Sequence, residues 1–274
     1  MFSSRSIKLK ALASPFGLQP KGLAFVISKY LLDVDIRCQA LDYGSRRGDF
    51  LLSLSSEYPN TSFLGVDLCM DDVEFANSLA ADVCNVSFSA IQKNVALPFD
   101  SSSFRVIYMI GVLEHIADKK KILSELRRVV SEDGFLIIAV PGKHLFSFLD
   151  MGNFKFRFPS LHKRFVTWRH GHEYYKKKFS HNPYGLFGDV EIEAGWHYHF
   201  ALNEFADLLA NSGLKIKHRF GVGFFQRVII NIMFFLPFLR KPLTTLLKLD
   251  SFYFSSTELL FVCSPVHAGS SDVS

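Results

Sequence analysis

The sequence lacks several features that define whole classes of protein. Its four cysteines have no Cys-x-x-Cys spacing and form no evident disulfide framework, which indicates reduced thiols in a cytosolic protein. The first 24 residues contain no acid but also no apolar core of a signal peptide. No internal repeat is present. The net charge of +5 is too small to argue for nucleic acid by itself.

Phenylalanine, in contrast, is abundant. The chain has 274 residues, of which 49% are hydrophobic and 21% charged, so it is able to build a sizeable core. The 29 Phe residues exceed what an ordinary core needs. They suggest apolar surface at a membrane or in an apolar pocket.

The first half of the chain alternates between strand and helix patterns after an irregular arm at 1–20. Short apolar strands and amphipathic helices in alternation predict a parallel sheet with helices on both faces. Asp133-Gly134 is expected to turn the chain into the last of these strands. The expected helices are 21–32, 50–58, 71–81 and 119–130, and the expected strands are 37–43, 62–67, 86–90, 104–110 and 135–140.

A glycine loop stands at the first strand-to-helix junction, in the stretch Leu41–Phe50. Glycine lets a ligand approach the backbone closely at a helix N-terminus. The spacing Gly44-x-x-x-Gly48 is not the GxGxxG of dinucleotide-binding loops, and no hydride-transfer site follows it. In parallel sheets ligands bind beyond the carboxyl ends of the strands, where this loop and Asp67 are expected.

The second half has two unusual segments. From 151 to 188 the chain is basic and aromatic with poor periodicity, and we interpret 145–200 as an inserted lid or substrate segment. A helix is expected at 203–212, followed by a strand at 214–220 with Leu214, Ile216 and Phe220 on one face. Residues 224–249 form an apolar helical insertion whose uninterrupted part is too short to cross a bilayer. The last strand is expected at 258–263, within a domain of 21–265, and 266–274 is expected to be a disordered tail.

Several motifs in order resemble one family. The string Phe104-Arg-Val-Ile-Tyr-Met-Ile-Gly-Val-Leu-Glu-His-Ile116 is similar to the fourth strand and following loop of class I S-adenosylmethionine-dependent methyltransferases. Leu97-Pro98-Phe99 precedes it, and the run from Leu126 to Pro141 follows it in the family's order. The resemblance covers about residues 35–142. It implies an α/β fold with a doubly wound, seven-stranded sheet, mostly parallel, with one antiparallel strand near the C-terminus.

The resemblance also assigns a cofactor site for S-adenosylmethionine. The amino-acid end of the cofactor is expected at the glycine loop, the ribose at Asp67, the adenine beside Asn94 and Val95, and the methionine part above Gly111. Arg46 stands where the family has a glycine, so its side chain has to point away from the cofactor. Arg105 stands at the start of the fourth strand, where the family frequently has an acid. The expected cofactor-binding residues are Asp42, Gly44, Ser45, Gly48, Asp67, Leu68, Asn94, Val95 and Gly111.

For the reaction we expect SN2 methyl transfer, most simply to oxygen, which benefits from a general base. The candidate bases are His199, His144 and His115, with an architectural role as the alternative for each. The histidine spacings bring no cysteine or carboxylate with them, so no metal is expected.

The acceptor is expected to be a small-molecule, glycan or lipid-linked substrate, and the basic lid also suits an anionic one. Nucleic acid is not favoured, because no RNA-binding module is visible. The protein is expected to be cytoplasmic, with peripheral membrane contact through 224–249. Two alternatives stay open, which are a catalytically weak methyltransferase-fold partner subunit and an interfacial membrane-binding protein.

Overall fold

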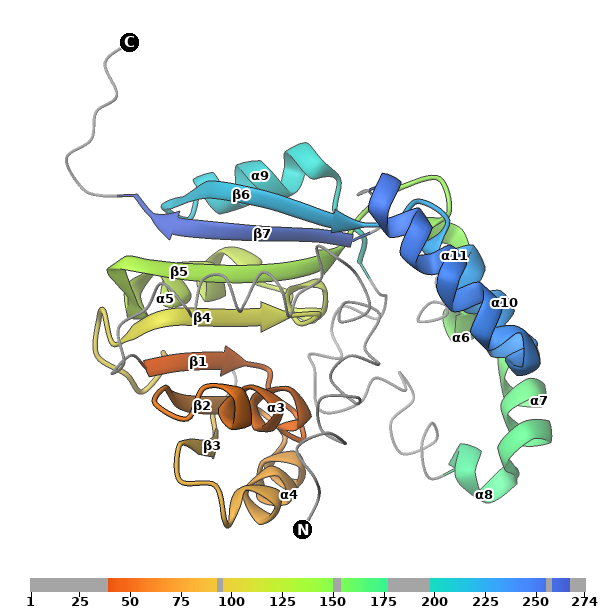
Figure 1. The fold of residues 1–274 in the computed structure, drawn as a ribbon, viewed down its shortest axis with the longest axis horizontal. Helices are drawn as coiled ribbons and strands as arrows, with labels where there is room; N and C mark the ends of the chain where they lie inside the picture. The colour runs from red at the N-terminus through yellow and green to blue at the C-terminus, as the bar shows by residue number, and fades with distance from the viewer. Residues whose placement is uncertain (1–38, 93–95, 150–153, 177–197, 255–257, 267–274) are drawn as a thin grey trace.

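The computed structural model describes residues 39–92, 96–149, 154–176, 198–254 and 258–266. Its centre is one seven-stranded sheet in the order β3-β2-β1-β4-β5-β7-β6 (Figure 1). Only β7 runs against its neighbours, because β5 and β6 both pair with it in antiparallel fashion. This is the expected fold class. The strands are β1 Gln39–Tyr43, β2 Ser62–Asp67, β3 Val86–Ala90, β4 Phe104–Ile110, β5 Val130–Pro141, β6 Leu214–Val222 and β7 Glu258–Pro265.

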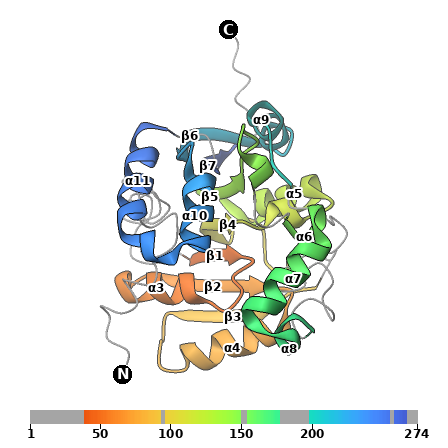
Figure 2. The ribbon, with the colours of Figure 1, turned by 90° about the vertical axis from the view of Figure 1, so that its right-hand side faces the viewer.

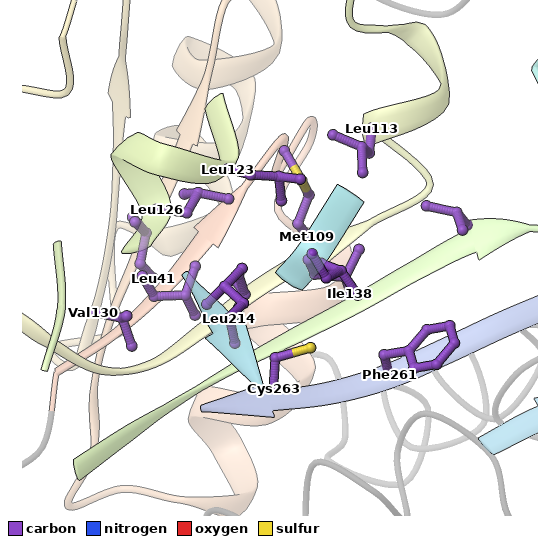
Figure 3. Close-up of a cluster of buried hydrophobic side chains, with 14 of the residues drawn as sticks. Leu41, Met109, Leu113, Leu123, Leu126, Val130, Ile138, Leu214, Phe261 and Cys263 are labelled. Atoms are coloured by element: carbon purple, nitrogen blue, oxygen red, sulfur yellow. The ribbon is translucent and has the colours of Figure 1, made fainter. Parts of the chain in front are cut away.

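Two apolar clusters hold helices against the two faces of the sheet. On one face, α5 (Lys119–Val129) and α9 (Leu202–Ala210) bury Leu123, Leu126 and Phe205 against the strands. Figure 3 shows the middle of this cluster, where Leu41, Ile138 and Phe261 point toward the helices. On the other face, α3 (Asp49–Glu57) and α4 (Met70–Ala80) bury side chains that include Leu51, Leu54, Val73 and Ala76.

The expected turn at Asp133-Gly134 is instead part of β5. Phe104 pairs with Val130 and Val106 pairs with Phe135, so the extra residues of β5 form a bulge at this point. Arg105, on the facing strand, forms an ion pair with Asp133. Arg105 at the start of β4 therefore pairs with the bulge of β5. This role is structural and lies away from the loops at the carboxyl ends of the strands.

The expected face of β6 is also wrong in part. Ile216 pairs with Cys263 and His218 with Val262, so one extra residue, Lys217, is bulged out. A bulge of one residue reverses the alternation of side chains. Ile216 consequently packs against the α5 and α9 side of the sheet, whereas Phe220 packs against the α3 and α4 side.

The segment expected as a lid is largely helical where it is described. It contains η2 (Ser147–Leu149), α6 (Phe154–Arg157), α7 (Pro159–His170) and α8 (His172–Tyr175). Proline at the first position of α7 and Gly171 at its end are favourable helix-boundary residues. Helical spacing is present in α7 at Leu161, Phe165 and Trp168, but the basic residues between them obscured it in the sequence.

The apolar insertion forms α10 (Gln226–Phe235), η6 (Pro237–Leu239) and α11 (Arg240–Tyr253). Together with α6, α7 and α8, these helices lie beyond the carboxyl ends of the parallel strands (Figures 1 and 2). None of the described helices is both long and apolar enough to cross a membrane. The arm at 1–20, the helix expected at 21–32 and residues 267–274 lie outside the described residues. Val266, the first residue of the tail expected to be disordered, is among the described residues, and its N–H donates to Gly213 O over 2.9 Å.

Candidate active site

The glycine loop lies where the strand order reverses between β1 and β4, which is where open α/β sheets bind ligands. Gly44 and Gly48 have φ angles of 85° and 76°, in the left-handed region that favours glycine. The N–H groups of Gly44 and Ser45 both donate to Val66 O, over 2.8 and 3.0 Å. These bonds fasten the loop to the end of β2.

Asp67 organises the backbone around this loop. Its Oδ2 accepts a hydrogen bond from Arg46 N over 2.8 Å, and its Oδ1 accepts one from Cys69 N over 3.0 Å. A carboxylate offers about four lone-pair directions, so each oxygen retains one for another donor. The side chain of Arg46 is exposed, and the loop uses its backbone in a left-handed conformation with φ of 49°.

Asp42, at the end of β1, is a buried acid. Burial and, to a smaller extent, the nearby charge of Asp67 together raise the pKa of Asp42 to about 7. Two acids held together in this way favour a cation close to them, because a positive charge relieves the repulsion and stabilises the ionised carboxylate. The pair therefore suits a ligand with a cationic group beside hydroxyl donors.

The other residues of the loop have packing roles that the sequence did not reveal. A Cβ on Gly44 would lie 2.4 Å from Val112 Cγ2, so the side chain of Val112 covers this glycine. A Cβ on Gly48 would lie 2.4 Å from the ring of Phe88. The hydroxyl of Ser45 is buried 2.7 Å from the Cβ position of Gly65, so Ser45 directs its side chain toward β2 and keeps only its backbone for the loop.

The loop after β4 supplies the next part of the site. Gly111 is exposed with φ of 65°, and its N–H donates to Ala139 O over 2.9 Å. The 3-10 helix η1 (Leu113–His115) follows, with Glu114 and His115 both buried and His115 Nε2 3.9 Å from Glu114 Oε1. Leu68 is half-buried next to Asp67. Asn94 and Val95 lie outside the described residues.

His144 and His199 come together beyond the end of β5. The Nε2 atom of His144 lies 3.2 Å from Arg227 Nε, and its Nδ1 lies 3.2 Å from the N–H of Phe146. Burial and, to a smaller extent, the charges of Arg227 and His199 together lower the pKa of His144 to about 4. His144 is thus a neutral ring with one acceptor nitrogen, which only one of these two donors can use at a time, and its low pKa makes it a weak proton acceptor at neutral pH.

His199 is half-buried and precedes Phe200, which is tied to the end of β5. The N–H of Phe200 donates to Pro141 O over 2.9 Å, and its carbonyl accepts from Lys143 N over 2.7 Å. These bonds hold His199 at the carboxyl edge of the sheet. His199 thus combines a fixed backbone with a half-buried side chain whose Nε2 atom is itself buried.

Two buried charged residues at this edge were not predicted from the sequence. Arg227 is 9% exposed, contacts His144 and has its Nη2 3.8 Å from Glu258 Oε1. Asp250 is also buried, and its Oδ1 accepts from the N–H groups of Phe224 and Phe225, each over 3.0 Å. For Arg227 the signal was a charge inside a largely apolar helix, because a buried charge is costly unless it has a partner. Asp250 stands among the charged and hydroxyl residues of α11, so the sequence carried no such signal for it.

Comparison with known proteins shows which proteins this part of the chain resembles. A family model described as a methyltransferase domain matches residues 41–138, from the glycine loop through β5. A sterol 4-C-methyltransferase of Caenorhabditis elegans is 28% identical over 118 residues, which are 41% of this chain and 33% of that protein. A ubiquinone/menaquinone biosynthesis C-methyltransferase of Citrifermentans bemidjiense is 26% identical over 125 residues, 44% of this chain and 52% of that protein. The chain thus spans about half or less of the length of these curated relatives.

Among solved structures, the YcgJ protein of Bacillus subtilis superimposes with a TM-score of 0.53 and 17% identity. The match covers 90% of this chain and 98% of that one. At this identity the likeness concerns the fold, which extends over the β6–β7 half that the family model does not reach.

Proposed function

We propose that this chain, a member of the class I S-adenosylmethionine-dependent methyltransferases, transfers a methyl group to an acceptor held between its glycine loop and its inserted helices. The observation that carries the proposal is the pair of hydrogen bonds from Arg46 N and Cys69 N to Asp67. They fix both carboxylate oxygens at the carboxyl ends of β1 and β2. A rigid acceptor pair at this place suits two neighbouring ribose hydroxyls.

The remaining residues fit the other parts of S-adenosylmethionine. Asp42 stands where the cationic amino group is expected, and its pKa of about 7 allows it to ionise when that group is present. The exposed Gly111 has nothing closer than Glu114 Oε1, 3.5 Å away, at its Cβ position. When bound, the sulfonium supplies an activated methyl group. The chain has to align the acceptor and exclude water.

For an oxygen acceptor, we assign the general base to His199. His144 is the weaker candidate because burial, together with the charge of Arg227 next to its Nε2 atom, keeps its pKa low. His115 is buried beside Glu114 in η1, where an architectural role is favoured. His144 and Arg227 then act as supports that hold the inserted helix α10 at the edge of the site.

The acceptor class follows from the surroundings of the site. Aromatic side chains gather next to His144, with ring centroids of Phe146 and Phe224 each 6.4 Å from its own. The names of both curated relatives refer to lipid-soluble compounds, a sterol and a quinone. We therefore favour an apolar or lipid-linked acceptor over a free, fully polar one. Both names refer to C-methylation, so methylation at oxygen is a proposal that rests on the histidines near the site and not on the relatives.

The proposal is tested with S-adenosylmethionine labelled in its methyl group and an extract that contains both lipids and water-soluble metabolites. Wild type is expected to move the label into a product that partitions into the organic phase. Asp67→Asn keeps the shape of the side chain but loses one acceptor oxygen, and it is expected to lose most of the transfer. Asp71→Asn, an exposed acid at the start of α4, is the matched control. Equal labelling by wild type, Asp67→Asn and a reaction without protein would contradict the proposal.

A further inference from the structure

Helices from two separate insertions pack into one continuous surface. The ring of Phe165 on α7 lies 5.8 Å from Phe234 and 5.6 Å from Phe235 on α10, measured between centroids. The guanidinium of Arg169 lies 5.1 Å from the centroid of Phe234. Figure 2 shows α7, α10 and α11 on the same side of the molecule, facing away from the sheet. These contacts make α7, η6, α10 and α11 one structural unit.

This unit exposes large apolar side chains at its outer side. Seven of them have half or more of their area exposed, and Trp168, Phe238 and Tyr253 reach 79%, 76% and 72%. Leu246, Leu249 and Tyr253 recur at helical spacing, so they share one side of α11. We call the seven, together with the basic residues around them, the docking surface: Leu161, Trp168, Phe235, Phe238, Leu246, Leu249 and Tyr253.

The charge of the same segments is strongly positive. Residues 154–176 and 226–253 contain ten Lys or Arg and two acids, one of which is the buried Asp250. The whole chain contains 31 Lys or Arg and 26 Asp or Glu, so the remainder has 21 basic and 24 acidic residues. Next to Trp168, an open hollow of about 520 Å³ is lined by residues that include Lys163, Arg164 and His172. The apolar and the cationic groups are therefore concentrated at one place.

We propose that the docking surface binds the face of an anionic lipid bilayer, with its aromatic residues among the headgroups and its basic residues on the lipid phosphates. Amphipathic helices with a basic rim and exposed aromatic residues lie in the interface plane in this way. A second copy of the chain is a poorer occupant, because two such cationic surfaces repel each other. The proposal does not depend on methyl transfer, since vesicle binding is measured without cofactor.

Trp168 is a built-in reporter for this test. The chain has only two tryptophans, Trp168 and Trp196, so Trp196→Phe leaves Trp168 as the only indole. With vesicles of equal parts phosphatidylcholine and phosphatidylglycerol, its emission is expected to shift to the blue and to be quenched by acyl-chain bromine. Emission that is unchanged by these vesicles contradicts insertion and overturns the proposal.

Sedimentation with the same vesicles separates the electrostatic contribution to binding from the apolar one. Lys241→Glu/Lys248→Glu is expected to lower the partition coefficient by at least about 25-fold, since each basic residue contributes about five-fold. Its control is Lys215→Glu/Lys217→Glu on β6, which makes the same change of charge at exposed positions outside the docking surface. Phe238→Glu/Leu246→Glu is expected to remove insertion, whereas Met70→Glu/Leu79→Glu, at similarly exposed positions of α4, is not.

Each remaining outcome decides against the proposal. Equal loss in a variant and its control means that general charge, and not the docking surface, determines binding. If the wild type stays in the supernatant as an oligomer and Phe238→Glu/Leu246→Glu is a monomer, the surface serves self-association instead. Melting temperatures of all variants establish that they remain folded.

Discussion

Arg46 donates its backbone N–H to Asp67 Oδ2 over 2.8 Å, while its side chain is exposed. The residue that departs from the family's glycine therefore preserves the loop through its main chain, at the cost of a left-handed conformation with φ of 49°. Asp67 in turn connects the loop to the start of α4 through Cys69. Cofactor binding is proposed to depend on this arrangement and on the neighbouring acid, Asp42.

The affinity for S-adenosylmethionine is expected to depend on pH through Asp42. Because the pKa of Asp42 is about 7, the acid is largely neutral at pH 6 and ionised at pH 8. The cationic amino group prefers the ionised form, so the dissociation constant is expected to rise as pH falls, by up to about ten-fold per unit. Calorimetry in buffers of different ionisation enthalpy should detect proton release on binding near pH 6.5. In Asp42→Asn the affinity should be weak and independent of pH.

The same residue is expected to destabilise the folded chain at high pH. An acid whose folded pKa is raised stays protonated while the unfolded chain ionises, so stability is lost as pH rises from about 4 to about 7. Asp42→Asn removes this cost and should gain roughly 2–4 kcal/mol at pH 8 and almost nothing at pH 4. Denaturant unfolding at the two pH values measures the difference. A gain of equal size at both pH values would show that the effect is not ionisation.

His144 is expected to act in the opposite direction over part of the same range. Its pKa is lowered to about 4, so the folded chain resists protonation while the unfolded chain accepts a proton near pH 6.5. Stability from this group is therefore present above pH 6.5 and is lost as pH falls toward 4. His144→Gln should reduce the loss at acidic pH, with stability measured from pH 4 to 7. In Arg227→Gln the pKa of His144, followed by NMR, should rise, and a pKa that stays near 4 would contradict the role of Arg227.

Gly44 and Gly171 offer a matched pair of substitutions. Both have a positive φ, 85° and 90°, but a Cβ meets Val112 at 2.4 Å in the first case and nothing within 4 Å in the second. Gly171, with ψ of 162°, is in a region almost restricted to glycine, so Gly171→Ala should cost about 1–3 kcal/mol of backbone strain alone. Gly44→Ala should cost more, measured as the change in unfolding free energy, and should also weaken cofactor binding. Val112→Ala in the Gly44→Ala background should recover the part of the loss that comes from the contact.

The sequence predicted most of the sheet because its strands carry local signals. The expected bounds at 62–67, 86–90 and 104–110 agree with β2, β3 and β4. The bulge at Lys217 was not predictable, because strict alternation in a sequence does not reveal an unpaired residue. Arg227 and His144 lie 83 positions apart, and the Gly48–Phe88 contact joins residues 40 apart, so both required the fold. The assignment of residues to cofactor or catalysis stays a prediction.

Calorimetric titration of S-adenosylmethionine into wild type, Asp67→Asn and Asp71→Asn at pH 8 tests the central claim most directly. We expect saturable binding to wild type and to Asp71→Asn. Asp67→Asn should bind about 5- to 150-fold more weakly, the range for losing hydrogen bonds to a charged acceptor. Absence of binding to wild type at millimolar cofactor, or equal affinity for wild type and Asp67→Asn, would contradict the account.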